Sequence, residues 1–176
     1  MKNNLLPINQ TSDTGDNEWD SRSCGICVLK MLMVFKKPEI QSVPIMTLLN
    51  QALEMSGYID GIGWRHQALA DLAAKYGVEL GFQKFFFDTP DKKKEGIKIV
   101  NNKLRSGEPV AVSVLKEFDI PKTAHLVVVA GFSKIWFFVW GYKIIDSYSG
   151  RRGNIYSVSK KEFLAGWRGG LIYFKN

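Results

Sequence analysis

Three residues far apart in the chain have the types that a nucleophilic thiol site requires. Cys24 opens an apolar segment that runs to Phe35, and Gly25 follows it directly. His125 precedes one run of apolar residues, and Asp146 follows another. A cysteine thiolate can attack a carbonyl carbon when a histidine takes its proton, and a carboxylate can hold that histidine in the productive orientation. These residues could therefore supply a nucleophile, its base and the group that orients the base.

The sequence around Cys24 favours the thiolate form of its side chain. Ser23 can cap a helix that starts at Cys24, which places the thiol at the positive end of the helix among unpaired backbone amides. Cys27 would lie one turn deeper and fits a buried structural role. The same two cysteines form a Cys-x-x-Cys motif, so a thiol–disulfide oxidoreductase is an alternative. Against it, residues 18–22 are polar, whereas such a motif should follow a buried strand.

Metal chemistry has little support in the sequence. The chain has two cysteines and two histidines, which is enough for a zinc site by number alone. Their spacing matches no short zinc motif, and His66 lies in a polar helical segment where a position at the surface or against a loop is expected. We therefore expect no metal and no organic cofactor.

Length and composition are typical of one well-packed domain. A chain of 176 residues can bury one core and is short for two. Its 45% hydrophobic and 12% aromatic content excludes general disorder, and no stretch is long and apolar enough to cross a bilayer as a helix. The N-terminus lacks the apolar core of a secretory signal, so we expect a cytoplasmic protein with reduced cysteines.

The net charge of +7 indicates attraction to anionic partners without identifying one. Much of the positive charge is concentrated between residues 84 and 105, a segment rich in lysine. No nucleic-acid motif accompanies this segment, so we interpret it as a solvated helix face and expect no nucleic-acid binding.

The order of the predicted elements indicates an α+β fold. Residues 1–22 show no periodicity and predict an irregular N-terminal arm, and residues 23–176 are expected to form a single domain. Within it, an N-terminal helical half would pack on a C-terminal antiparallel β-sheet, and Cys24 would face His125 across the cleft between the two halves. Helices are predicted at 23–35, 44–56, 64–76, 89–107 and 159–167, a loop at 58–63, and strands at 78–82, 85–87, 109–115, 124–132, 135–145 and 171–174. The strand at 135–145 is expected to be buried.

The order of several motifs resembles the papain-like cysteine peptidases that process bacteriocins with double-glycine leaders, the C39-like peptidases. The segment Ser-Cys-Gly-Ile-Cys-Val-Leu-Lys-Met-Leu at 23–32 is similar to the nucleophile block of that family. The resemblance extends from about Glu18 to the C-terminus. It implies a papain-like fold, a peptide or protein substrate, and Cys24 as nucleophile, His125 as base and Asp146 as orienting group. The other blocks lie, in the order of the family, at 61–64, 69–77, 107–112, 124–132, 144–147 and 162–167.

One position departs from the family pattern. The family has a glutamine six residues before the nucleophile, where its amide binds the oxyanion, and this chain has Glu18 there. A carboxylate cannot donate that hydrogen bond. Asn17 could supply the amide through a one-residue shift of the loop, with the Cys24 backbone N–H as the second donor. Otherwise the chain would be a catalytically impaired module that binds a peptide. Acyl transfer to an acceptor other than water uses the same triad and stays open.

Overall fold

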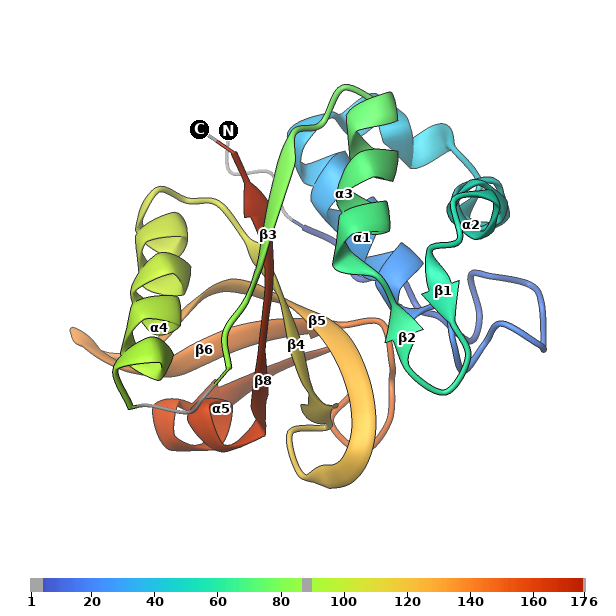
Figure 1. Ribbon diagram of the computed structural model, residues 1–176. Coiled ribbons are helices and arrows are strands. Elements are labelled where there is room, and N and C mark those ends of the chain that lie inside the picture. Colours follow the sequence, from blue (N-terminus) through green and yellow to red (C-terminus); the bar gives the residue numbers. More distant parts are fainter. Residues whose placement is uncertain (1–4, 87–89, 176) are drawn as a thin grey trace.

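The computed structural model describes residues 5–86 and 90–175, and it places helices on both faces of a central sheet (Figure 1). Residues 5–23 run as turns and extended chain without a helix or strand, and the first four residues of the predicted arm lie outside the described residues. No described helix has both the length and the apolar character that crossing a membrane requires.

The N-terminal helices pack around α1 (Cys24–Lys36). Residues 25–33 of α1 are all buried, because this helix contacts its neighbouring helices on one side and the sheet on the other. Its apolar residues are therefore not confined to one stripe. Ser23 precedes the helix, but its hydroxyl makes no capping bond and instead accepts a hydrogen bond from the Cys27 thiol, so the predicted side-chain cap is wrong. The other N-terminal segments are the 3-10 helix η1 (Pro38–Ser42), α2 (Ile45–Glu54) and α3 (His66–Lys75).

An antiparallel sheet forms the centre of the molecule. In the described part of the chain it has six strands in the order β3-β8-β4-β5-β6-β7. The strands are β3 (Leu80–Lys84), β4 (Val110–Lys116), β5 (Ile120–Ile135), β6 (Phe138–Asp146), β7 (Ile155–Ser159) and β8 (Trp167–Phe174).

Helices cover both faces of this sheet. Leu126 and Val128 of β5 pack in the core with α1, α2 and α3, whereas Val127 and Val129 pack in the core with α4 (Pro90–Arg105) and α5 (Lys160–Gly166). Because successive residues of a strand point to opposite faces, a sheet covered on both faces needs apolar residues at every position. This explains why the sequences of the central strands are apolar at successive positions.

The structure confirms the predicted fold class, an α+β arrangement with an N-terminal helical half packed on an antiparallel sheet. Some elements differ. The predicted loop at 58–63 contains a short hairpin, β1 (Tyr58–Ile59) and β2 (Gly63–Trp64), so the next helix begins at His66. The region of the two strands predicted at 78–82 and 85–87 holds one described strand, β3, and Phe87 lies outside the described residues. Strand β7 was not predicted.

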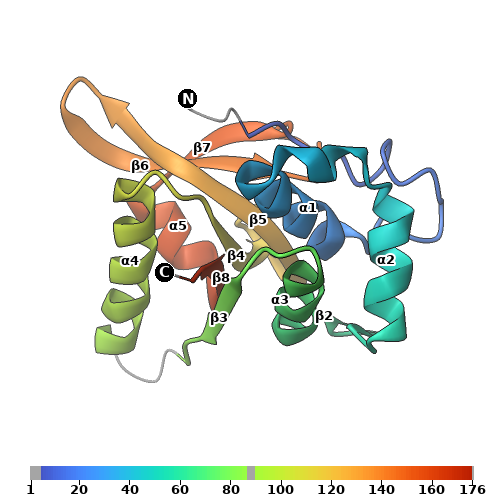
Figure 2. The same cartoon turned by 90° about the horizontal axis from the view of Figure 1, so that it is seen from above.

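The prediction that residues 135–145 form a buried strand is wrong for the first part of that segment. Residues 135–138 form the tip of the β5–β6 hairpin, and their side chains are between 62% and 94% exposed. This tip extends beyond the residues that β4 and β7 pair with, so no neighbouring strand covers it (Figure 2). The chain reverses at Trp136, which has a positive φ of 54°, without the Gly, Pro or Asn that usually signals such a turn.

Candidate active site

The register of β5 and β6 brings His125 and Asp146 together. Asp146 ends β6 and pairs with Val127 of β5. Cross-strand partners point to the same face of a sheet, and so do residues two apart on one strand. The Asp146 carboxylate is therefore a diagonal neighbour of the His125 ring, and His125 Nε2 donates to Asp146 Oδ1 over 2.6 Å.

The Asp146 carboxylate is held by further donors. The backbone N–H of Tyr148 donates to Asp146 Oδ1 over 2.8 Å, and the Tyr156 hydroxyl donates to Asp146 Oδ2 over 2.8 Å. Asp146 and His125 are both buried. A buried carboxylate needs such partners, and these donors also fix its orientation toward the histidine. Tyr156 was not among the candidate residues, because it lies on β7, the strand that the sequence did not predict.

Cys24 meets this pair from the other half of the molecule. It is the first residue of α1, and it lines the same cleft as His125, close enough for each side chain to shift the pKa of the other. Burial raises the pKa of the Cys24 thiol, but the hydrogen bond with His125, the charge of that ring and a hydrogen bond from the Leu126 backbone together lower it below its ordinary value. Burial alone would lower the pKa of His125, yet its contacts with Asp146 and Cys24 raise it to about 10. Both shifts favour the thiolate–imidazolium form of the pair over the neutral thiol and imidazole.

Cys27 has the opposite environment. Its side chain is fully buried, and burial raises the pKa of its thiol to about 12. Both cysteines are free thiols. Cys27 is therefore protonated and shielded at neutral pH, as expected for a structural residue.

The thiol opens onto a cleft of about 600 Å³ between the two halves of the molecule. Its walls come from the loop before α1, the β1–β2 hairpin, and strands β3, β4, β5 and β8. His66, expected at the surface or against a loop, lines this cleft, and burial with the nearby charge of Lys84 lowers the pKa of its ring to about 4. The imidazole of His66 is therefore neutral at pH 7.

Gln10 ties the N-terminal segment to both sides of the site. Its side chain is 1% exposed. Gln10 Nε2 donates to the Asp20 carbonyl over 2.7 Å, and Gln10 Oε1 accepts from the Ser147 hydroxyl over 2.9 Å. One residue thus connects the loop before Cys24 to the residue after Asp146. Gln10 was not among the candidate residues, because an isolated glutamine in a polar segment belongs to no recognisable pattern.

The two residues considered as oxyanion donors lie elsewhere. The side chains of Asn17 and Glu18 are exposed, and among the described residues neither lines the cleft. The Cys24 backbone N–H begins α1 and has no hydrogen-bond acceptor within the described ranges. This amide is therefore free to donate to a bound group.

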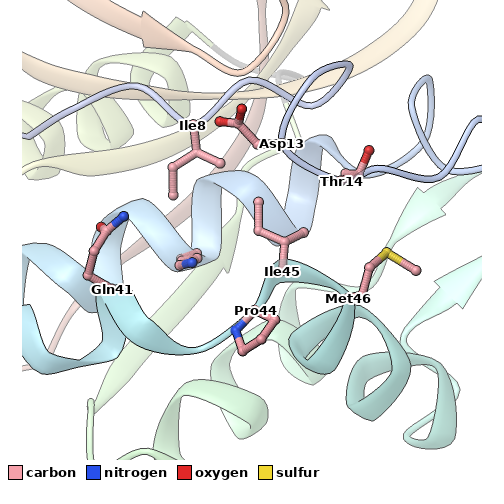
Figure 3. Close-up of a pocket in the computed structure, with 8 residues that line it drawn as sticks. Ile8, Asp13, Thr14, Gln41, Pro44, Ile45 and Met46 are labelled. Carbon is pink, nitrogen blue, oxygen red and sulfur yellow. The ribbon is translucent and has the colours of Figure 1, made fainter.

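A second cavity, of about 290 Å³, lies between the N-terminal segment, α1 and the start of α2 (Figure 3). Neither cysteine nor histidine is among the described residues that line it. Lys30, the cation in its wall, donates from Nζ to the Val43 carbonyl over 2.7 Å. This cavity therefore lacks the groups that thiol chemistry needs.

Comparison with known proteins identifies the class of fold. No protein-family model matches the chain, and neither does any curated protein sequence. Among solved structures, a C39-like peptidase from Bacillus anthracis is similar with a TM-score of 0.66 at 17% identity, over 98% of this chain and 96% of that one. A double glycine motif protease from an AMS/PCAT transporter, solved in complex with the leader peptide, has a TM-score of 0.56 at 17% identity, over 86% of this chain and 84% of that one.

The peptidase domain of Streptococcus mutans ComA is also similar, with a TM-score of 0.53 at 17% identity over 97% of this chain and 98% of that domain. The chain therefore has the fold of the C39-like peptidases, and the resemblance of its motifs is confirmed at the level of the fold.

Proposed function

We propose that the protein is a cysteine peptidase in which Cys24 is the nucleophile, His125 the base and Asp146 the orienting group. One observation carries this proposal: the Cys24 thiol at the start of α1 lies beside a buried histidine that is hydrogen-bonded to a buried carboxylate, and the thiol opens onto a cleft. A thiolate held in this way is a nucleophile at neutral pH.

In the proposed reaction the Cys24 thiolate attacks the carbonyl carbon of a peptide bond. The new C–S bond gives a tetrahedral oxyanion, to which the Cys24 backbone N–H can donate. The C–N bond then breaks, and the leaving nitrogen takes the proton of His125, which leaves a thioester. His125 next takes a proton from water, the resulting hydroxide attacks the thioester carbonyl, the C–S bond breaks to release the Cys24 thiolate, and the acid product leaves.

The likeness to peptidase structures supports a peptide or protein as the substrate. The transporter protease was solved with its leader peptide bound, so that fold accommodates a peptide. The cleft next to Cys24 is large enough for several side chains of an extended chain. No step of the proposed reaction requires a metal or an organic cofactor.

Peptide cleavage and thiol labelling test the proposal together. The wild-type protein is incubated with a mixture of synthetic peptides, and the products are identified by mass spectrometry. We expect cleavage by wild type and none by Cys24→Ala. The matched control is Cys27→Ala, which should retain cleavage because Cys27 is buried with a protonated thiol. Cleavage that survives Cys24→Ala would overturn the assignment of the nucleophile.

A peptide-binding module without turnover is the second candidate, and the position of Glu18 favours it. A family member with glutamine there would have an amide donor that this chain lacks, and losing one such donor costs about 10²–10³ in turnover. Because the side chains of Asn17 and Glu18 are exposed and line no part of the cleft, we expect Glu18→Gln and Asn17→Ala each to change turnover less than about threefold. A large gain for Glu18→Gln would mean that this loop moves into the cleft when a substrate binds.

A further inference from the structure

The cleft beside Cys24 is lined by positive side chains from separate elements. Arg22 comes from the loop before α1, Lys84 ends β3, and Arg168 lies on β8. Among the described residues, no Asp or Glu lines this cleft, and none of these cations forms an ion pair. Cations that share a cavity without counter-charges create a positive potential inside it.

Two of the cations are held close together. Lys84 Nζ donates to the backbone carbonyl of Arg168, so the ammonium stays in the wall of the cleft. Burial lowers the pKa of Lys84, and the charge of Arg168 lowers it further, which indicates that the two cations repel each other. His66, which also lines the cleft, is neutral and does not compensate them. An anionic group bound between Lys84 and Arg168 would relieve this repulsion.

The nearest acidic residues do not neutralise the cleft. Asp60 belongs to the β1–β2 hairpin and acts on Tyr58, a lining residue, but its own side chain is exposed and does not line the cleft. The carboxylate of Asp146 already accepts the hydrogen bonds from His125, Tyr148 and Tyr156 described above. The free anion that the cations can attract must therefore come from a ligand.

We infer that the cleft selects peptide segments with acidic side chains near the bond held at Cys24, with Lys84 and Arg168 as the residues that determine this preference. The inference rests on the proposed peptidase function and names its substrate class. Opposite charges raise the rate of encounter and disfavour basic peptides, while the thiol site itself is indifferent to side-chain charge.

Binding to Cys24→Ala tests the preference separately from turnover. Three labelled peptides of one sequence carry Glu, Gln or Lys at the same positions, and their affinities are measured by fluorescence anisotropy. We expect affinity to fall from Glu to Gln to Lys, by about tenfold or more between Glu and Lys at low salt, with the difference shrinking as salt is added. Equal affinity of the three peptides would overturn the inference.

Charge variants test which residues cause the preference for acidic peptides. Lys84→Glu combined with Arg168→Glu should reverse the order of affinity, so that the Lys peptide binds best. Lys84→Gln combined with Arg168→Gln should make the three affinities equal. The matched control is Lys98→Glu combined with Lys161→Glu, which makes the same change of net charge at exposed positions outside the cleft. If the control alters the order as much as the cleft variants do, the overall charge is responsible and the inference fails.

The two proposals fail in distinguishable ways. If wild type cuts no peptide but Cys24→Ala binds the Glu peptide best, the peptidase function is wrong and the charge preference of the cleft stands. If wild type cuts the Glu, Gln and Lys peptides with equal kcat/KM and Cys24→Ala binds them equally, the peptidase function stands and the charge preference is wrong.

A second inference rests on another surface, the aromatic hairpin tip, which we define as residues 135–138 with Trp140. Ile135, Trp136, Phe137 and Phe138 are 62%, 88%, 94% and 79% exposed, and Trp140 is 37% exposed. The tip projects away from the rest of the molecule, at the end of β5 opposite to His125 (Figure 2). Leaving large apolar side chains in water is unfavourable relative to burying them, and contiguous apolar patches mark interaction sites.

The charge around the tip indicates what it binds. Residues 120–145, which include all of β5 and all of β6 except its last residue, Asp146, contain no Asp or Glu. Lys134 flanks the tip and Lys143 lies further along β6, and both are exposed. Tryptophan and phenylalanine next to lysine, on a convex projection, match the interface of an anionic bilayer, where aromatic rings insert and cations meet the headgroups. We propose that the aromatic hairpin tip inserts into the surface of an anionic membrane.

Sedimentation with lipid vesicles tests this second proposal. We expect the protein to bind vesicles of phosphatidylcholine with about 30% phosphatidylglycerol, and to bind pure phosphatidylcholine more weakly. Phe137→Ser and Trp136→Ser should each reduce binding by about tenfold. The control Phe86→Ser removes an equally large side chain that is 68% exposed outside the tip and should leave binding unchanged.

Insertion also has a spectroscopic signature. The fluorescence of Trp136 should shift to the blue with anionic vesicles, and Trp136→Phe should lose most of this shift while retaining binding. Absence of binding, or equal binding by Phe137→Ser, would refute insertion. A dimer in solution that Phe137→Ser converts to a monomer, without any vesicle binding, would show that a second copy of the chain covers the tip instead.

Discussion

At the scale of single residues, the site depends on opposite environments for two similar cysteines. Despite burial, the interactions with His125 and with the Leu126 backbone lower the pKa of Cys24, whereas burial raises the pKa of Cys27 to about 12. The pKa of His125 is raised to about 10 by Asp146 and Cys24. The thiolate–imidazolium pair therefore exists at pH values between the lowered pKa of Cys24 and the raised pKa of His125.

Alkylation with iodoacetamide follows directly from these environments. Because the pKa of Cys24 is lowered and that of Cys27 is raised, Cys24 has the larger thiolate fraction, so we expect it to react about 100-fold faster than Cys27 at pH 6. Peptide mass spectrometry after timed labelling measures both rates. Asp146→Asn removes the charge that supports the imidazolium, so the labelling of Cys24 should then rise only as the pH approaches the ordinary thiol pKa. Equal, slow labelling of both cysteines in the wild type would contradict the proposed nucleophile.

A second prediction concerns the partner of Asp146 that the sequence did not indicate. Tyr156→Phe removes the donor to Asp146 Oδ2 and leaves a buried carboxylate oxygen without that hydrogen bond, which should lower the free energy of unfolding by about 1–3 kcal/mol. It should also reduce kcat more than it changes KM, since the carboxylate holds His125. Urea unfolding and steady-state kinetics measure the two effects.

Tyr148→Phe is the matched control for Tyr156→Phe. Tyr148 contacts Asp146 through its backbone N–H, which the substitution keeps. We therefore expect Tyr148→Phe to leave both stability and kcat close to those of wild type. Equal losses from the two variants would mean that the hydroxyl of Tyr156 has no special role.

At the scale of elements, the start of α1 depends on close packing against the β1–β2 hairpin. A Cβ atom added at Gly25 would lie 2.5 Å from the Cγ and Cδ1 atoms of the Trp64 ring. The Trp64 Nε1 atom donates to the Arg22 carbonyl over 2.6 Å, so this ring is held and cannot yield easily. The glycine after Cys24 therefore has a packing reason in addition to leaving the sulfur accessible.

Gly25→Ala tests this packing. We expect it to lower the free energy of unfolding by about 1–3 kcal/mol, because overpacking forces Trp64 or α1 to move. Gly131→Ala is the control, since a Cβ at Gly131 meets no atom within 4 Å, and it should change stability by less than about 0.5 kcal/mol. Thermal or urea unfolding measures both variants, and equal effects would refute the packing argument.

At the scale of the whole molecule, the site is assembled from segments that are far apart in the chain. Both cores share the central sheet, which supports the proposal that residues 23–176 form a single domain. Gln10 adds a connection that bypasses the sheet, since it joins the loop before Cys24 to Ser147 beside Asp146. The N-terminal segment therefore belongs to the structure that positions the thiol.

Gln10→Ala removes both side-chain hydrogen bonds of this connection and keeps the one that the Gln10 backbone N–H donates to the Ser147 carbonyl. Because it leaves the Asp20 carbonyl and the Ser147 hydroxyl without their partner, we expect a loss of about 2–4 kcal/mol in the free energy of unfolding. The labelling of Cys24 should also slow. Thr11→Ala serves as control, because Thr11 is exposed and bonds only locally to Asn9. Unchanged stability of Gln10→Ala would show that the arm is dispensable.

The fold class could be predicted from the sequence, because helical spacing and apolar runs are local properties. Cys24, His125 and Asp146 could be identified as candidates, because their residue types limit the chemistry that each can perform. Only the tertiary structure decided the position of His66 in the cleft and the roles of Gln10 and Tyr156. Their partners lie on other segments, and a single polar residue carries no pattern that names a distant partner. It also decided that residues 135–138 are exposed. The sequence of an apolar run does not show whether neighbouring strands will cover it. Here the exposure of the run depends on where β4 and β7 end.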